Sequence, residues 1–250
     1  MTSANSRGRA RDALFYCAAL EDAGDVVLGG DEVDHVKAQR LQPGDSLMLF
    51  DGRGQVARGT VRSIVRREIR IAIGERRRES PPRPRIELYC AVPKGDRVAV
   101  LLDMATQLGM SRFTPVRWTR AVVEPGARAA GRWQRVCLEA CKQSRRVHLP
   151  EIGAPVTLAD AIAKARAGGA RLLLAHPGSR TALASPPDFA SAPRVALFAG
   201  PEGGLVDDEL TLLRDAGADF LSLGEGILRI ETAAIALLAA VNVLGTFENK

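Results

Sequence analysis

The segment Leu197-Phe198-Ala199-Gly200-Pro201-Glu202-Gly203-Gly204 contains the pattern from which the fold of this chain can be predicted. Its first half closes a compact apolar run, 194–199, of the kind that is buried on both faces in a parallel sheet. Its second half is a glycine-rich turn, and residues 207–216 after it predict a helix with three acids in its first turn. A buried strand, a tight turn and a helix in this order predict an α/β domain with a mostly parallel sheet.

The alternation of strands and helices continues on both sides of this segment. Strands are expected at 86–92, 113–116, 171–175 and 220–223, and helices at 96–108, 132–144, 158–167 and 231–244. Residues 14–79 have a different pattern, with short strands expected at 26–28, 46–50, 55–65 and 67–73 and one helix at 32–41. Short strands at this spacing predict a small β-barrel.

The stretch Glu79-Ser80-Pro81-Pro82-Arg83-Pro84 separates the two patterns. Three prolines in four positions cannot continue a strand ladder, and they favour an extended spacer. We therefore expect two domains, a β-barrel at 1–80 and an α/β domain at 85–250.

The net charge of +6 is unevenly distributed along the 250 residues. Residues 91–150 hold 11 Lys and Arg against 4 Asp and Glu, whereas residues 151–250 hold 8 against 12. A basic stretch beside an acidic part is typical of a protein that binds a polyanion on one face, although an arginine-rich composition explains the charge distribution equally well.

No apolar run is long enough to cross a bilayer, and the first 12 residues lack the apolar core of a signal peptide. The four cysteines lack metal-ligand spacing, so we expect a cytoplasmic protein with buried, reduced thiols and no metal site.

Three turns in the second domain each follow a buried strand. They contain His176-Pro177, residues 200–204 and residues 223–229. Because ligands in open α/β sheets bind beyond the carboxyl ends of the strands, the three turns are expected to meet at one site. Glycines in two of the turns allow the backbone to approach a ligand closely. The acids after Gly204 argue against a phosphate ligand, and the chain has neither a dinucleotide-binding glycine motif nor a P-loop.

Segments 197–204 and 223–229, with Glu231-Thr232-Ala233-Ala234, resemble the RsmE family of SPOUT-class 16S rRNA (uracil-N3)-methyltransferases. The resemblance covers most of the chain, since it extends to Pro43-Gly44-Asp45, Phe50-Asp51-Gly52, Lys94-Gly95-Asp96, Gln107-Leu108-Gly109 and Ala140-Cys141-Lys142-Gln143-Ser144. It implies an N-terminal PUA-like β-barrel that binds RNA. It also implies a C-terminal α/β domain with a deep trefoil knot, an exception to the rule that chains are not threaded.

The resemblance further implies S-adenosylmethionine as cofactor, 16S rRNA of the small ribosomal subunit as substrate, and a homodimer whose interface completes the site. The implied cofactor-binding residues are Leu174, His176, Gly200, Glu202, Gly203, Leu223, Gly224, Ile227, Leu228 and Thr232. The chain departs from the family at Glu225-Gly226, where proline and arginine are usual. It also has Val206 where an N-capping serine is common, so Asp207 is expected to cap the following helix.

Methylation at uracil N3 requires loss of the N3 proton and a base that is unpaired or flipped out of its helix. Arg229 is the candidate for stabilising the developing negative charge. Glu202 and Glu231 are both candidates for accepting the proton, and Glu231 equally fits an ordinary acid in the first turn of a helix. Contacts with RNA phosphates are expected at Arg40, Arg62, Arg66, Arg132, Arg135, Lys142, Arg145 and Arg146.

Two other functions remain open from the residues alone. One is a non-catalytic RNA-binding module, which would fail to bind S-adenosylmethionine. The other is a related SPOUT enzyme that acts on transfer RNA or on a ribose 2′-oxygen, which a nucleoside digest would identify.

Overall fold

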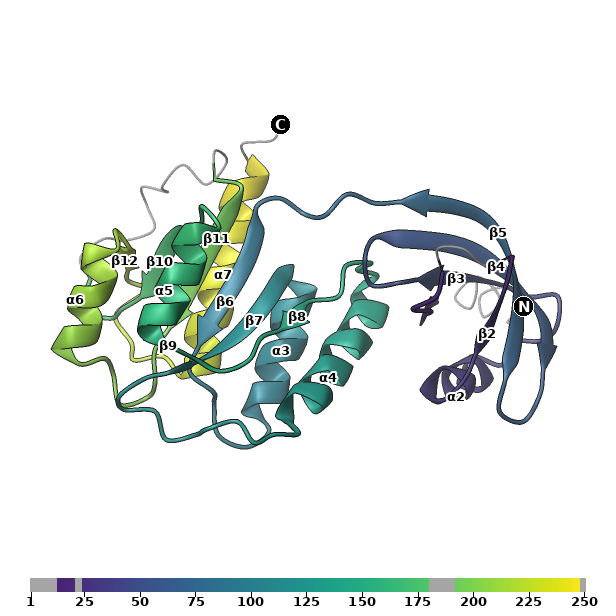
Figure 1. Ribbon diagram of the computed structural model, residues 1–250, viewed down its shortest axis with the longest axis horizontal. Helices are drawn as coiled ribbons and strands as arrows, with labels where there is room; N and C mark the ends of the chain where they lie inside the picture. Colours follow the sequence, from purple (N-terminus) through teal and green to yellow (C-terminus); the bar gives the residue numbers. More distant parts are fainter. Residues whose placement is uncertain (1–12, 21–23, 180–191, 248–250) are drawn as a thin grey trace. The chain divides into compact units, whose positions relative to one another are not determined.

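The computed structural model describes residues 13–20, 24–179 and 192–247, and the chain divides into two compact units (Figure 1). The first unit consists of residues 1–81 and 141–149, and the second of residues 82–140 and 150–250. The segment 141–149 therefore packs with the first unit, although the sequence analysis places it in the C-terminal domain. Within the described ranges no helix has the length and apolar character needed to span a membrane.

The first unit is a curled five-stranded sheet in the order β1-β3-β4-β5-β2. Its strands pair antiparallel, except that β1 and β3 are parallel. Alternate residues such as Leu47, Leu49 and Ile71 point into one apolar core, which confirms the expected small barrel as a curled, mixed sheet. The elements are β1 (Leu14–Tyr16), β2 (Asp25–Leu28), α2 (Asp31–Ala38), β3 (Ser46–Phe50), β4 (Gln55–Ile64) and β5 (Ile69–Arg78).

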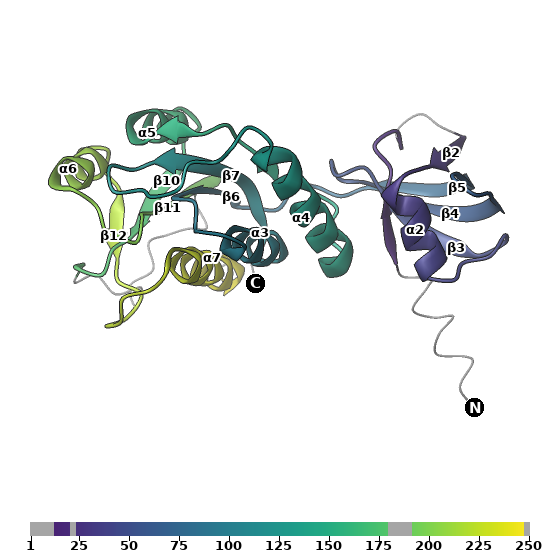
Figure 2. The same ribbon diagram turned by 90° about the horizontal axis from the view of Figure 1, so that it is seen from below.

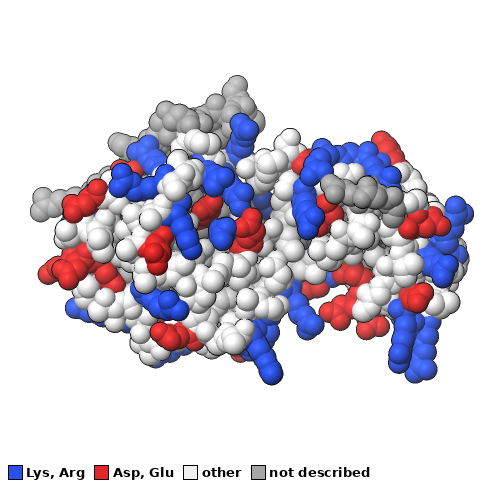
Figure 3. Space-filling view, in the orientation of Figure 1, with Lys and Arg blue, Asp and Glu red and all other residues white. Residues whose placement is uncertain are grey.

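Strand β5 extends five residues beyond the Ile73 end that the sequence predicts. Its last residues are arginines, which have no strong strand propensity, but β4 supplies an antiparallel partner as far as the pair Gln55 and Arg78. Lys and Arg side chains gather over this end of β5 (Figure 3). The tertiary pairing therefore places a basic segment on a strand rather than in a linker.

The second unit is a parallel sheet in the order β12-β10-β11-β6-β7-β8, with β9 also paired to β7. Helix α5 covers one face, and α3 and α7 pack together on the other (Figure 2). The predicted mostly parallel α/β sheet is confirmed. The elements are β6 (Arg85–Cys90), α3 (Arg97–Gln107), β7 (Met110–Arg117), α4 (Ala129–Ser144), β8 (Glu151–Ile152), β9 (Val156–Thr157), α5 (Leu158–Ala167), β10 (Arg171–Ala175), β11 (Arg194–Ala199), α6 (Asp207–Asp215), β12 (Asp219–Leu221) and α7 (Ile230–Phe247).

Helix α6 begins differently from the prediction. Asp207 is already the first helical residue, Val206 is the N-cap, and no side chain of the N-cap bonds to the helix. Instead, the Glu209 carboxylate reaches back and accepts a hydrogen bond from the Val206 N–H at 3.0 Å. The expectation that Asp207 caps the helix is wrong, because Asp207 lies within the first turn and the N-cap position belongs to Val206.

The four cysteines are all buried, as expected, and none of them forms a disulfide bond. Burial raises the pKa of Cys137 to about 11, so this thiol stays protonated at neutral pH. The cysteines therefore act as small core residues.

Candidate active site

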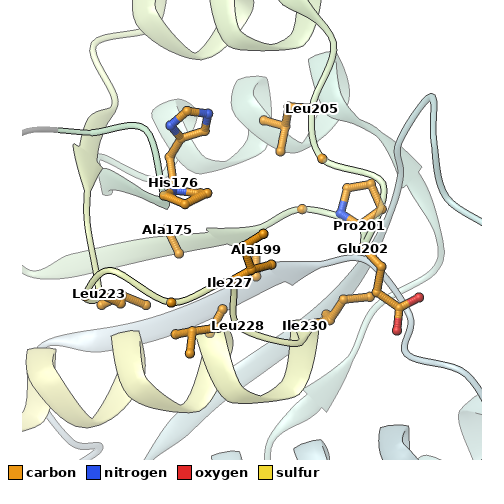
Figure 4. A pocket seen from close by; sticks show the side chains of 16 residues that line it. Ala175, His176, Ala199, Pro201, Glu202, Leu205, Leu223, Ile227, Leu228 and Ile230 are labelled. Carbon is orange, nitrogen blue, oxygen red and sulfur yellow. The ribbon is translucent and has the colours of Figure 1, made fainter.

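A pocket lies at the carboxyl ends of β10, β11 and β12, where the three predicted turns meet (Figure 4). Its cavity of about 150 Å³ has an open mouth. The convergence of three turns on one site is thus confirmed. The lining consists of Ala175, His176, Pro177, Ala199, Gly200, Pro201, Glu202, Gly204, Leu205, Leu223, Gly224, Gly226, Ile227, Leu228, Ile230 and Ala233.

The wall of the pocket is mainly apolar. His176 and Leu223 lie on one side of the hollow, and Pro201 and Glu202 lie on the other (Figure 4). The pKa of His176 is lowered by burial and by nearby Arg214, and its Nδ1 accepts a hydrogen bond from the Gly178 N–H at 3.2 Å. His176 is therefore uncharged at neutral pH, which leaves Glu202 as the charged side chain among the described lining residues.

Two glycines of the lining are constrained, one by a neighbouring side chain and the other by its backbone conformation. A Cβ at Gly200 would lie 2.3 Å from Cδ1 of Leu205, so the side chain of Leu205 occupies the space that any larger residue needs. Gly224 has a φ of 120°, a backbone conformation that other residues rarely adopt. The turns after β11 and β12 are thus shaped by packing and by backbone conformation respectively.

The turn after β11 is also held from outside by the loop that follows β7. The guanidinium of Arg120 donates to the Gly203 carbonyl at 3.0 Å. The buried carboxylate of Glu209 accepts from the Thr119 N–H at 2.7 Å while also bonding to Val206. These bonds attach the glycine-rich turn and the start of α6 to Thr119 and Arg120, which lie far earlier in the sequence.

Arg97, the first residue of α3, joins the two acids that the sequence proposes for catalysis. Its Nη2 lies 2.9 Å from Oε1 of Glu202, and its Nη1 lies 3.6 Å from Oε1 of Glu231. Its Nε donates to the Lys94 carbonyl at 3.3 Å, so all three guanidinium nitrogens have partners. The Glu202 side chain is 36% exposed and that of Glu231 is 13% exposed, and only Glu202 is among the residues that line the pocket.

Most of the predicted cofactor-binding residues line this pocket. Three do not: Leu174 is fully buried beneath it, Gly203 lies outside it against Arg120, and Thr232 is exposed on α7. Arg229 is exposed just before α7 and does not line the pocket. The residues that do line it are His176, Gly200, Glu202, Leu223, Gly224, Ile227 and Leu228.

Sequence reasoning missed Arg97, Arg120 and Leu205. Leu205 directly follows the quoted glycine-rich segment, so its nearness to the site was visible in the sequence. Arg97 and Arg120 follow the ends of β6 and β7, the same edge of the sheet as the turns, but strand order was needed to bring them to the pocket.

The basic residues expected to contact RNA differ in exposure. Exposed side chains belong to Arg40, Arg62, Arg66, Arg132, Arg135 and Arg145. Arg146 is partly buried, and burial lowers its pKa. Lys142 is buried, with its Nζ 2.7 Å from Oε1 of Glu32, so the expectation of a phosphate contact there is corrected. Its ammonium neutralises an internal carboxylate and is turned away from solvent.

Comparison with known proteins gives a consistent result. Residues 79–242 match the family model described as RNA methyltransferase domain. Ribosomal RNA small subunit methyltransferase E from Mycobacterium bovis is 35% identical over 245 residues, which cover 92% of this chain and 91% of that protein. The protein of the same name from Synechocystis is 33% identical, covering 82% of this chain and 68% of that protein.

Solved structures agree with the sequence comparisons. Ribosomal RNA small subunit methyltransferase E from Neisseria gonorrhoeae, crystallised with S-adenosylmethionine, superposes with a TM-score of 0.84 at 26% identity and covers 94% of this chain and 98% of that one. A Legionella pneumophila protein solved with the same cofactor gives a TM-score of 0.84 at 28% identity, with the same coverage. The α/β fold class is confirmed, and the knot stays a prediction. The chain belongs to the RNA methyltransferase domain family and, within it, to the ribosomal RNA small subunit methyltransferase E group.

Proposed function

We propose that this chain transfers the methyl group of S-adenosylmethionine to N3 of a uridine in the 16S rRNA of the small ribosomal subunit, in the cytoplasm. Support comes from the family of the chain and from relatives named for small-subunit ribosomal RNA. The observation that carries the proposal is the pocket at the carboxyl ends of β10 and β11, where three turns surround an apolar hollow beside one carboxylate. In this proposal residues 1–80 form the RNA-binding barrel and residues 85–250 the catalytic domain.

The residues of the pocket fit the cofactor. Leu223, Ile227 and Leu228 offer apolar surface suited to a flat adenine ring, and the lining carries Glu202 but no lysine or arginine among its described residues. An acidic rim suits a ligand with a positively charged sulfonium. When bound, the cofactor supplies an electrophilic methyl group, and the turns at Gly200 and Gly224 are proposed to hold it through backbone groups.

Glu202 is the proposed proton acceptor. It lines the pocket and is more exposed than Glu231, which does not line the pocket. A uracil at the mouth can pass its N3 proton to Glu202 directly or through one water. Glu231 is proposed to anchor Arg97, which in turn orients Glu202.

Arg229 is proposed to stabilise the uracil anion as the proton leaves. Its side chain is exposed where α7 begins, next to Leu228 of the lining. A guanidinium that meets charge only as it develops accelerates the reaction without tightening ground-state binding. The uridine must be unpaired or flipped out to reach this position.

A homodimer and a basic RNA track complete the proposal. Ile227 is 92% exposed and Val122 is 70% exposed, and apolar side chains in water beside a pocket favour coverage by a second copy. The proposed RNA contacts of this track are the exposed arginines Arg40, Arg62, Arg66 and Arg145 of the first unit and Arg132 and Arg135 of the second, together with the partly buried Arg146.

The test is to map methylated nucleosides by mass spectrometry. Small-subunit rRNA from cells that lack the protein is compared with the same RNA after treatment with purified protein and S-adenosylmethionine. We expect one 3-methyluridine in 16S rRNA that appears only with the protein. A methylated transfer RNA or a 2′-O-methylated nucleoside would contradict the proposed target. Absence of S-adenosylmethionine binding by calorimetry would identify a non-catalytic RNA-binding module.

A further inference from the structure

A shallow groove lies on the first unit, away from the pocket described above. It has a volume of about 80 Å³. Its lining combines two apolar residues with four charged ones: Met48, Val56, Arg58, Glu75, Arg76 and Arg77.

Strand register explains how this groove forms. Arg58 pairs with Met48 across β3 and β4, and Val56 pairs with Arg77 across β4 and β5. The neighbouring Ala57 belongs to the core of the barrel. Since successive side chains of a strand point to opposite faces, Val56 and Arg58 lie on the outer face of the curled sheet.

A β-bulge lies at the same place. The pairing of β4 and β5 shifts between Ala57 and Gly59, so Gly74 and Glu75 together oppose the single residue Arg58. Bulges bend a strand and re-aim its side chains, and they are frequent beside functional sites. Here the bulge separates the apolar inner half of β5 from its basic end, Arg76 to Arg78.

The floor and the rim of the groove differ in character. The half-buried Met48 offers the accessible apolar surface of the floor, and Val56, which is only 1% exposed, lies beneath that surface. On the rim, Arg77 is 61% exposed and its guanidinium donates to Glu79 at 2.6 Å and 3.2 Å. Both bonds, from Nε and from Nη2, end on the same oxygen, Oε1 of Glu79, and they hold the plane of the guanidinium in place while leaving most of the side chain in solvent. The lining alone carries three arginines and one glutamate.

We propose that this groove holds an unpaired nucleotide of the RNA substrate. The inference rests on the proposed function in so far as RNA is the substrate. Guanidinium groups pair with phosphate in a two-donor fork and stack on bases, and an apolar floor accepts the face of a base. A hollow of about 80 Å³ admits only part of one base, with the sugar and phosphate outside it beside the arginines, and it is too small for the side of a duplex.

This location differs from the barrel residues that the sequence analysis selects. Arg62 and Arg66 lie near the hairpin that joins β4 and β5, where Ile64 pairs with Ile69. The groove lies towards the other end, where Gln55 pairs with Arg78. On β4, Arg58 and Arg62 are four residues and therefore about 13 Å apart, so the groove and the hairpin end are neighbouring positions that can be altered one at a time.

The experiment compares two double variants of the full chain, Arg58→Ala with Arg77→Ala and, as the matched control, Arg62→Ala with Arg66→Ala. Binding to a short single-stranded oligouridine is measured by fluorescence anisotropy at several salt concentrations. For the groove variant we expect at least about tenfold weaker binding and a salt slope lower by about 1.4, which corresponds to two phosphate contacts. The control removes two proposed phosphate contacts of the RNA track but leaves the groove intact, so its salt slope should fall by a similar amount while its affinity falls less, and the cofactor affinity of both variants should equal that of the unaltered chain.

Replacement of both groove arginines by lysine separates a nucleotide site from a merely basic surface. Lysine retains the charge but lacks the planar fork, so we expect the salt slope to be kept and the affinity to stay low. Full recovery of affinity with lysine would overturn the proposal. Unchanged binding by the alanine variant, a larger loss in the control, or displacement of the RNA by an acidic peptide but not by a mononucleotide would also overturn it.

Methylation of 16S rRNA by the unaltered protein is measured in parallel. If methylation occurs while the groove variant binds RNA normally, the groove proposal alone fails. If RNA binding depends on the groove but no methylated uridine forms, the proposed function alone fails.

Discussion

Replacement of Lys142 by Met is expected to destabilise the first unit strongly. Nζ of Lys142 lies 2.7 Å from Oε1 of Glu32, and the two side chains are only 5% and 10% exposed. Removing one partner of a buried ion pair leaves the other charge without compensation and costs about 3–5 kcal/mol. The Tyr16 N–H still donates to Glu32 at 3.3 Å, so we expect a value near the lower bound, about 3 kcal/mol.

Hydrogen exchange on the full chain measures this loss within the first unit alone. If the amides of β4 and β5 exchange by unfolding of that unit, about 3 kcal/mol accelerates their exchange by roughly 100-fold or more. The double variant Glu32→Gln with Lys142→Met removes both charges and is expected to recover a large part of the loss. Unchanged exchange in Lys142→Met, together with RNA binding that loses the salt dependence of one contact, would show that Lys142 faces RNA instead.

The buried pair of Glu32 and Lys142 also predicts that the stability of the first unit depends on pH. Burial raises the pKa of Glu32, but the neighbouring His35 and Lys142 outweigh it, so the pKa lies below its ordinary value of 4.5. A carboxyl with a lowered folded-state pKa contributes stability above its unfolded pKa, and that contribution is lost as pH falls through the folded pKa. The stability difference between the unaltered chain and Lys142→Met should therefore be full while Glu32 is ionised in both proteins, and it should narrow as the pH falls from the higher folded-state pKa of Glu32 in the variant to the lowered one in the unaltered chain.

Three further predictions concern the active site. Gly200→Ala places a Cβ 2.3 Å from Leu205, so calorimetry should show weaker S-adenosylmethionine binding, and adding Leu205→Ala should restore it; unchanged affinity in the single variant would contradict the assigned turn. Arg229→Ala should lower the single-turnover methylation rate by about 100-fold with little change in cofactor affinity, and a parallel loss of melting temperature and cofactor binding would indicate a structural ion pair instead. Arg97→Met should lower the rate and change its pH profile because Glu202 loses its orientation, with partial rescue by Arg97→Lys; an unaltered pH profile would argue against this positioning role.

The regular elements of the second unit were largely predictable because their signals are local. The apolar runs of β10 and β11 were assigned with the observed bounds, as was α5. The short strands β8 and β9 were missed because two residues carry no periodic pattern and become strands only through pairing with β7. The basic end of β5 was missed for the same reason, since β4 supplies its ladder.

The active site was predictable in part. Turns that follow buried parallel strands meet at one edge of the sheet, and this general rule was enough to bring His176, Gly200 and Leu223 together. It could not separate Glu202 from Glu231, because both acids lie near the same edge. Only the packing of α3 against α7 places Arg97 between them, with Glu202 in the lining of the pocket and Glu231 outside it.

The sequence by itself thus determined the α/β class, the curled sheet, the glycine turns and the family of the chain. These depend on side-chain periodicity and backbone conformation, which are properties of neighbouring residues. The tertiary structure alone decided the roles of charged residues such as Lys142 and Arg77. The free energy of a charge depends on its burial and on the partner that approaches it, and for Lys142 that partner is Glu32, 110 residues away in the chain.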